Sequence, residues 1–389
     1  MSRSWLQRFE KARDARRRAR VRCPWRVTEG CCHSTCRLTG EDCDGCRSSP
    51  VSAILPTVNE SMADILGTIQ TIREGTAGPV QFVVVDDCSS PRLELPPGTL
   101  QEGDVFLRND DRLGCTTSRR RALAYATGEF VSLPDAHMGW GPGNLRKLCH
   151  LARKHAGLAY AGCNKHTACN LMLLDGVLEA KWNGSPYKGQ EGPVRTTCMM
   201  GASYTIERAR LLDAGGWVAL PGFAGSQEMN QALNLQRQGI PIICALDLAA
   251  SNWHQFRDAP CAPVPFAGYQ LNLCLAHRTF WSDETWRERW KPALLARKFV
   301  SHNKAKTPWR MRPEVVDQAE EWAPWPGATP ESDASFLAAL QLGPTDLEDS
   351  TAQVACSGCG GSGWIGREAC SDCRGTGYAY VTVAAGETR

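Results

Sequence analysis

Short apolar runs alternate with amphipathic stretches in the region that begins at residue 51. Val51–Leu55 is an apolar-rich run with the length of a buried strand, and it stops at Pro56. Met62–Arg73 has the pattern of a helix, and Gln81–Val85 is a second apolar run. A strand, a helix and another strand in this order predict two parallel strands of one sheet.

The same alternation continues towards residue 137. Strands are predicted at Val105–Arg108 and Glu129–Leu133, with a helix at Thr116–Ala126 between them. Polar residues follow two of the predicted strands directly, as Asp86-Asp87 and as Asp135-Ala136-His137. Ligands of open parallel sheets bind beyond the carboxyl ends of the strands. The pattern therefore predicts an α/β domain with a ligand site at this edge of its sheet.

Asp135 and His137 offer a carboxylate and an imidazole two residues apart, and both groups can bind a divalent metal. A single Asp-x-His pair at the end of a strand is nevertheless more typical of an ordinary polar loop. The pair becomes informative only together with the motifs on either side of it.

The order of motifs from Val51 to about Trp290 resembles the GT-A glycosyltransferases of the family 2 type, most closely the catalytic domain of polypeptide N-acetylgalactosaminyltransferases. The resemblance covers about 240 of the 389 residues and implies a Rossmann-like nucleotide-diphospho-sugar transferase fold. The matching motifs are Pro56-Thr57-Val58-Asn59-Glu60, Val85-Asp86-Asp87, Arg108-Asn109-Asp110 with Gly114 and Arg119, Ala126–Glu129, Asp135-Ala136-His137, Pro193–Thr197, Met200-Gly201-Ala202, Ala214–Trp217 and Trp253-His254-Gln255-Phe256-Arg257.

This resemblance implies a role for each matching residue. Asp135, His137 and His254 would hold Mn²⁺ or Mg²⁺ on the diphosphate of a nucleotide sugar, expected to be a UDP-sugar. Mixed oxygen and nitrogen ligands suit Mn²⁺, and a dication would stabilise the charge that develops on the departing diphosphate. The residues that would bind the nucleotide sugar are Pro56, Asn59, Glu60, Asp86, Asp87, Arg119 and Arg257.

Three of these residues also have simpler explanations. Asp87 could cap a turn and Glu60 could cap a helix. His254 stands between Trp253 and Phe256, so it could be a core histidine whose hydrogen bonds are satisfied.

Glu228 falls at the position of a family glutamate near the reacting sugar. The run before it, Ala224–Gln227, departs from the family pattern and leaves the identity of the donor sugar open. An inverting reaction would need a general base, and Glu228 is then the candidate, with Asp135 contributing to catalysis through the metal. The resemblance implies retention instead, in which the leaving phosphate can take the proton. The sequence decides neither the donor nor the stereochemistry.

Paired cysteines near the C-terminus form a duplicated Cys-x-x-Cys-x-Gly-x-Gly motif, which resembles the zinc modules of DnaJ-type chaperones. Four thiolates at this spacing suit one tetrahedral zinc ion, and the glycines permit the tight turns around it. The predicted ligands are Cys356, Cys359, Cys370 and Cys373.

The N-terminal region combines positive charge with a second group of cysteines. Residues 1–26 contain ten Arg or Lys and two acidic residues, whereas the whole chain has a net charge of +3. A solvated basic arm is the simpler interpretation, and attraction to a polyanion such as nucleic acid is the alternative. The cysteine spacing is irregular, so zinc binding competes with free or oxidised thiols. Cys43 and Cys46 form a plausible half-site, which two of Cys23, Cys31, Cys32, Cys36 or His33 would complete. The set proposed among these alternatives is Cys31, Cys36, Cys43 and Cys46.

Length, composition and the distribution of motifs limit the class of protein and suggest a division into domains. The chain has 389 residues, 42% apolar and 22% charged, and lacks the run of about 20 apolar residues that spans a membrane. The first residues do not resemble a secretion signal, so a cytoplasmic protein of a bacterium or a phage-infected cell is expected. The predicted division is a basic, Cys-rich module at 1–49, a GT-A domain at 50–298, a linker or wrapping segment at 299–354 and a zinc module at 355–381.

Three functions fit these features. The favoured hypothesis is transfer of a sugar to hydroxymethylated bases in DNA, such as phage DNA, with the basic arm contacting phosphates. The alternative, taken from the resemblance, is O-glycosylation of Ser or Thr in a polypeptide. The third is a non-catalytic, zinc-containing module that binds nucleic acid or protein.

Overall fold

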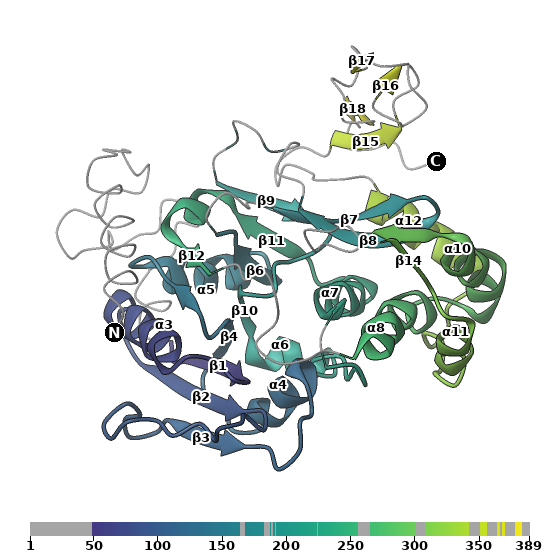
Figure 1. Cartoon of the computed structure of the whole chain (residues 1–389). Coiled ribbons are helices and arrows are strands. Elements are labelled where there is room, and N and C mark those ends of the chain that lie inside the picture. Colours follow the sequence, from purple (N-terminus) through teal and green to yellow (C-terminus); the bar gives the residue numbers. More distant parts are fainter. Residues whose placement is uncertain are drawn as a thin grey trace.

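The structure, a computed structural model, describes residues 49–163, 168–182, 187, 190, 192–223, 225–255, 265–300 and 308–341, with short strands at 351–355, 364–365, 368–369 and 378–382. Its centre is an eight-stranded, mostly parallel sheet (Figure 1). The strands of this sheet are β1 Val51–Thr57, β2 Val80–Asp86, β3 Val105–Arg108, β4 Phe130–Pro134, β6 Leu158–Ala161, β9 Pro193–Thr196, β10 Ser203–Glu207 and β11 Ile242–Ala245.

The order of strands across the sheet is β3-β2-β1-β4-β10-β6-β11-β9. β1 pairs in parallel with both β2 and β4, so the chain winds outward in two directions from β1. In a sheet of this kind, the crevice between the two halves opens at the carboxyl ends of the strands. β10 is antiparallel to β4 and β6. This mixed α/β arrangement is consistent with the predicted GT-A, Rossmann-like fold.

Helices pack against the sheet and extend beyond it. α4 contacts β1 and β2, whereas α5 contacts β10 and β6. The helical segments are α3 Met62–Gly75, α4 Cys115–Leu123, α5 Asn144–Lys154, α6 Arg208–Asp213, α7 Gln227–Arg237, η2 Leu246–Ser251, α8 Phe266–Arg278, α9 Asp283–Thr285, η3 Trp286–Trp290, α10 Lys291–Ala296, α11 Pro313–Ala319 and α12 Pro330–Gln341. Among the described helices, none combines the length and the apolarity that a bilayer crossing needs.

Small antiparallel pairs complete the described fold. The turn between β7 and β8 is the two-residue loop Asp175-Gly176, and both residues have positive φ (47° and 80°), as a tight hairpin of this twist requires. The pairs are β5 Met138–Gly139 with β12 Trp253–His254, β7 Cys169–Leu174 with β8 Val177–Trp182, β13 Lys298–Val300 with β14 Pro308–Arg310, β15 Thr351–Ala355 with β18 Tyr378–Thr382, and β16 Trp364–Ile365 with β17 Glu368–Ala369.

The predicted strands are present with bounds shifted by up to two residues, and the largest difference is at the end of the first. β1 continues through Pro56 to Thr57, so the prediction that the strand stops at Pro56 was wrong. β4 pairs with β1 only over Val51–Ala53. Pro56 therefore lies where one side of β1 has no strand partner, a position at which the missing N–H of a proline is tolerated.

The segment after the predicted domain boundary packs against the α/β core. Val316 and Ala319 of α11 and Leu340 of α12 are buried in the common hydrophobic core. Arg237 of α7 forms an ion pair with Asp333 of α12. The described part of the predicted linker or wrapping segment, residues 308–341, thus contributes side chains to the common core.

His277 ties this helical part to the β7–β8 hairpin. It is fully buried; Nδ1 donates to the Leu273 carbonyl at 2.9 Å, and Nε2 accepts from the Leu178 N–H at 3.1 Å. Both contacts use the neutral imidazole. Burial lowers the pKa of His277 from 6.5 to about 4.

Acidification is therefore expected to destabilise the fold. Between pH 6.5 and 4 the unfolded chain binds a proton at His277 that the folded chain excludes, so stability falls as the pH falls. The loss at pH 5 relative to pH 7 should be about 2 kcal/mol, measured by urea unfolding. His277→Gln should remove most of this pH dependence. His155→Gln, at a partly exposed histidine whose pKa burial also lowers to about 4, should remove less because solvent screens that site. A pH dependence unchanged in His277→Gln would contradict the assignment.

Candidate active site

The chain brings Asp135 and His254 together through a short antiparallel pair. β4 ends at Pro134, Asp135 follows, and β5 begins at Met138. In the pairing of β5 with β12, His254 lies opposite Met138, and the Gln255 N–H donates to the His137 carbonyl at 3.2 Å. Residues 119 positions apart in the sequence thus become neighbours because β12 docks on β5.

Helix α3 fixes the other edge of β5. The Thr68 hydroxyl contacts both the N–H and the carbonyl of Met138, each at 2.9 Å. Thr71 accepts from the Trp140 N–H at 3.2 Å. Because these hydroxyls satisfy backbone groups that have no strand partner on that side, the turn carrying Asp135 and His137 is held on a rigid element. The sequence pattern of α3 gave no sign of this role.

Asp135, His137 and His254 form a compact, partly exposed donor set. One ligand atom from each can be chosen so that all three lie within 4.8 Å of one another. Nε2 of His254 lies 3.1 Å from Oδ2 of Asp135, and the two imidazole rings are 4.7 Å apart. One carboxylate and two imidazoles at this spacing fit a divalent transition metal with positions left for a ligand. The convergence predicted from the sequence is present in the structure.

Electrostatics keep Asp135 in its ionised form. Burial alone would raise its pKa, but the hydrogen bond and charge of His254, with the charges of His137 and Arg119, hold the pKa below its usual value. An ionised carboxylate is the form that binds a metal. The site can therefore receive a cation at neutral pH without first losing a proton from Asp135.

Glu60 belongs to this cluster in a way that its sequence position did not suggest. Its Oε1 lies 3.2 Å from Nδ1 of His137. A carboxylate on one ring nitrogen orients a metal-binding histidine and makes its other nitrogen a better ligand. Glu60 was predicted to bind the nucleotide sugar or to cap a helix, whereas its observed contact is with His137. The N-cap of α3 is Ser61, which accepts from the Asp64 N–H.

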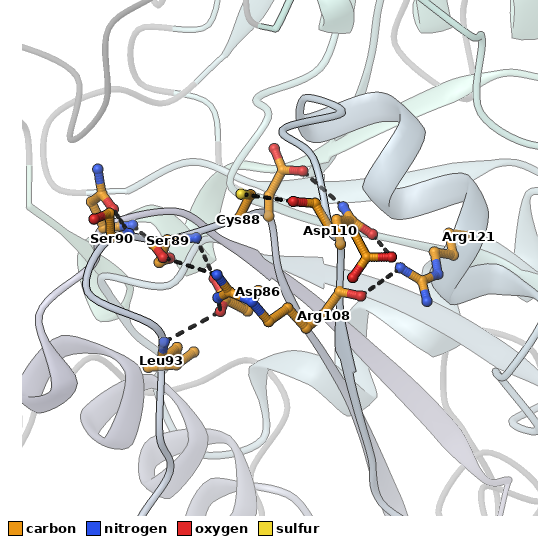
Figure 2. Close-up of polar contacts among 11 residues, drawn as sticks. Asp86, Cys88, Ser89, Ser90, Leu93, Arg108, Asp110 and Arg121 are labelled. Carbon is orange, nitrogen blue, oxygen red and sulfur yellow. Dashed lines mark hydrogen bonds and ion pairs between the residues drawn. The ribbon is translucent and has the colours of Figure 1, made fainter.

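Asp86 is enclosed by its own loop and by the neighbouring strand (Figure 2). Its carboxylate accepts from the N–H groups of Ser89 at 2.9 Å and Leu93 at 3.3 Å. Arg108, which lies opposite Asp86 in the parallel β2–β3 pair, forms an ion pair with it. The Asp86 carboxylate is 0% exposed, and its contacts hold the loop after β2. Its role in binding the nucleotide sugar stays a prediction.

Asp87 organises the segment that leads into α4. It accepts from Asn109 Nδ2 at 2.7 Å and from the N–H groups of Leu113 and Gly114 at 2.8 and 2.9 Å. Of the two interpretations, nucleotide binding and capping of a turn, these contacts match the second.

Two more predicted nucleotide-binding residues make contacts inside the protein. Asn59 has a positive φ of 51°, its N–H donates to Ser89 Oγ at 2.9 Å, and its Oδ1 accepts from the Ser90 N–H at 2.8 Å. Arg119 is buried and donates to the Tyr204 hydroxyl at 3.3 Å and to the Gly201 carbonyl at 3.1 Å. Arg119 is therefore held inside the protein, and its positive charge helps to lower the pKa of Asp135.

Glu228 lies in the first turn of helix α7 and lines a cavity together with Gly201. The Asp135 N–H donates to the carbonyl of Ala202, the residue after Gly201, at 3.1 Å, which brings this cavity close to the metal-binding cluster. Burial raises the pKa of Glu228, Arg119 opposes this, and the negative charge of Asp135 adds to it. Gly201 makes the position possible: a Cβ at residue 201 would lie 2.1 Å from Oε1 of Glu228. The sequence predicted that Glu228 lies near the reacting sugar. Gly201 was named only as part of the motif Met200-Gly201-Ala202, without a role of its own.

Gly201→Ala is expected to displace the Glu228 carboxylate, because the added methyl group overlaps it. A misplacement of about 1 Å near the reacting atoms can cost about 100-fold in rate, so a 10- to 100-fold loss of turnover is expected. Steady-state kinetics would measure it. Gly75→Ala is the matched control, since its added Cβ meets nothing closer than 3.3 Å. Equal activity of the two variants would mean that the position of Glu228 does not matter.

The remaining predicted site residues lie outside the described residues. They are Arg257, the N-terminal cysteines Cys31, Cys36, Cys43 and Cys46, and the C-terminal cysteines Cys356, Cys359, Cys370 and Cys373.

The solved structures that are similar to this chain include the following three. GalNAc-T7 with UDP, GalNAc and Mn²⁺ is 15% identical over 62% of this chain and 49% of its own, with a TM-score of 0.45. The mannosyltransferase PcManGT from Pyrobaculum calidifontis with GDP-Man and Mn²⁺ is 17% identical over 59% and 62%, with a TM-score of 0.39. S. aureus TarS 1–349 with UDP-GlcNAc is 16% identical over 59% and 65%, with a TM-score of 0.40. The chain thus spans about half to two thirds of the length of these proteins.

One family model matches part of the chain, whereas no match to the chain was found among the curated proteins. Residues 52–171 match the family described as Glycosyl transferase family 2. The matched segment contains Asp135 and His137, whereas His254 and Glu228 come from the chain after it. This match supports a glycosyltransferase.

Proposed function

We propose that this protein is a metal-dependent glycosyltransferase that moves a sugar from a nucleotide sugar to a hydroxyl group. The expected donor is a UDP-sugar. The observation that carries the proposal is the convergence of Asp135, His137 and His254 beside the cavity that contains Glu228. The match of residues 52–171 to glycosyl transferase family 2 supports the same reaction class.

The side chains divide the chemistry between them. Asp135, His137 and His254 would hold Mn²⁺ or Mg²⁺, which supplies Lewis-acid stabilisation of the diphosphate leaving group. Glu60, whose Oε1 lies 3.2 Å from Nδ1 of His137, would orient this ring. If the reaction inverts the anomeric centre, Glu228, whose pKa is raised by burial, would accept the proton of the acceptor hydroxyl.

The test is turnover of nucleotide sugars. The full-length protein would be incubated with a panel of UDP-sugars, with GDP-mannose as a comparison, in the presence of Mn²⁺, Mg²⁺ or a chelator. We expect metal-dependent hydrolysis of at least one donor and binding of UDP that requires the metal. Failure to bind any nucleotide with either metal would leave only the non-catalytic binding module, the third hypothesis.

For the acceptor, we propose a hydroxymethylated base in DNA. The support is the basic stretch at residues 1–26, whose charge suits DNA phosphates. Deleting residues 1–26 should then weaken salt-sensitive duplex binding and leave UDP-sugar hydrolysis unchanged. Transfer to Ser/Thr peptides, unaffected by the deletion, would support the polypeptide alternative.

We also propose that the C-terminal cysteines bind zinc. The support is their spacing, since two Cys-x-x-Cys pairs supply four thiolates for a tetrahedral site. Elemental analysis of the purified protein should find zinc, and the double variant Cys370→Ser, Cys373→Ser should lose it. A zinc content unchanged in that variant would refute the assignment. For the N-terminal group the corresponding pair is Cys43→Ser with Cys46→Ser.

A further inference from the structure

A cavity of about 230 Å³ is lined by residues other than Asp135, His137 and His254. It lies close to the candidate metal site, because the Asp135 N–H donates at 3.1 Å to the carbonyl of Ala202, which follows the lining residue Gly201. Glu228 and Gly201 form one part of its wall. It is smaller than the ~300–1,000 Å³ of sites for drug-sized ligands, so it suits a single ring-sized group.

Three aromatic side chains from the chain after the family match form another part of this wall. They are Tyr269 of α8, Phe299 of β13 and Trp309 of β14. Phe299 and Trp309 are directly opposite each other in the β13–β14 pair and stack at 4.3 Å with an interplanar angle of 11°. Tyr269 meets Trp309 edge-on at 6.1 Å. We call these three residues the aromatic wall.

The aromatic wall is tied to the segment that carries Glu228. A Cβ on Gly225 would lie 2.2 Å from the ring of Tyr269, so glycine permits close packing of this loop on the ring. Asn272, on the same helix as Tyr269, donates to the Gly225 carbonyl at 3.1 Å. The aromatic faces and the Glu228 carboxylate are therefore held in one rigid arrangement.

The charges of the cavity disfavour an anionic occupant. Two carboxylates line it, those of Glu228 and Glu179, and no basic side chain does so among the described lining residues. Glu179 forms ion pairs with Lys181 and Arg297, which leaves Glu228 as the main source of charge. A phosphate group would be repelled here, whereas an uncharged ring with hydrogen-bond donors would be stabilised.

We propose that this cavity is the acceptor site and that it receives an extruded hydroxymethylated pyrimidine base, packed against the aromatic wall with its hydroxyl towards Glu228. This rests on the proposed function. A Ser or Thr side chain would leave most of the cavity unfilled, whereas a flipped base is read by stacking and polar contacts of this kind. In the transfer, the acceptor oxygen forms a bond to the anomeric carbon of the sugar. The bond between that carbon and the diphosphate oxygen breaks, and its electron pair stays on the diphosphate oxygen. The proton of the acceptor hydroxyl passes to Glu228 or to the leaving phosphate.

The experiment separates acceptor from donor kinetics in Trp309 variants. Trp309→Ala should raise the KM for a duplex containing 5-hydroxymethylcytosine about 10-fold or more, because base stacking is lost. Trp309→Phe, which keeps an aromatic face, should restore most of this. The KM for the UDP-sugar in hydrolysis without acceptor should be unchanged in both. Trp325→Ala, which removes a partly buried tryptophan packed on Phe280 outside the cavity, is the control.

Three results would overturn the proposal. A change in the donor KM with an unchanged acceptor KM would place the donor sugar in the cavity. Transfer to Ser/Thr peptides but not to modified DNA would assign the cavity another occupant. Equal acceptor KM values in wild type and Trp309→Ala would show that the aromatic wall does not contribute to binding of the acceptor base. Melting temperatures identify an unfolded variant, and Trp309→Leu then gives the same comparison. Absence of any metal-dependent UDP-sugar turnover would instead refute the proposed function itself.

Discussion

Asp135→Asn is expected to lower metal-dependent turnover of the UDP-sugar by about 10³-fold, because a bound dication contributes several kcal/mol to stabilisation of the leaving group. The amide keeps the shape of the side chain but removes its charge. It also weakens the contact that holds His254 at 3.1 Å from Asp135. Two of the three ligands are thus affected by one substitution.

The measurement is the initial rate as a function of Mn²⁺ concentration, with metal affinity from calorimetry in the presence of UDP. Asp247→Asn is the matched control: this carboxylate is 31% exposed, pairs with Lys147 and lies in η2, a few residues before His254. It should leave both quantities near the wild-type values. An Asp135→Asn enzyme with unchanged metal affinity would show that the metal, if required, binds elsewhere.

Much of this site was predictable because its parts lie in short local patterns. The apolar runs that became β2 and β4 are each followed by polar residues, and parallel strands bring such ends to one edge of the sheet. His254 could be placed there only through the family resemblance. What the structure adds is the physical cause, the docking of β12 on β5.

Other features could not be predicted because they depend on how distant segments meet. The ion pair of Asp86 with Arg108 was not predicted, because it arises from the parallel register that places Arg108 opposite Asp86, and a fully buried charge needs such a partner. Gly201 matters only because the first turn of α7 approaches it. The pattern around Trp309 suggested a linker or wrapping segment, and its position on the cavity wall follows from the β13–β14 pairing.

Glu228→Gln is expected to reduce turnover by about 100-fold or more if Glu228 takes the acceptor proton, since positioned general bases contribute about 10²–10⁴-fold. Glutamine fits the space that Gly201 leaves but cannot accept the proton. Metal affinity should be unchanged because Glu228 is not in the donor set. Glu320→Gln, at an exposed carboxylate paired with Lys291, is the control.

The pH profile identifies the cause of such a loss. Burial raises the pKa of Glu228, so its carboxylate becomes protonated at a higher pH than an ordinary glutamate does. Only the ionised form can accept a proton, and the wild-type rate should therefore fall as the pH falls through this raised pKa. In Glu228→Gln that decrease should be missing, and the rate should stay low and flat across the same range. A variant that loses less than 10-fold and keeps the acid limb would assign the proton to the leaving phosphate. In that case Glu228 would act by holding the substrate, and its loss should appear in KM more than in kcat.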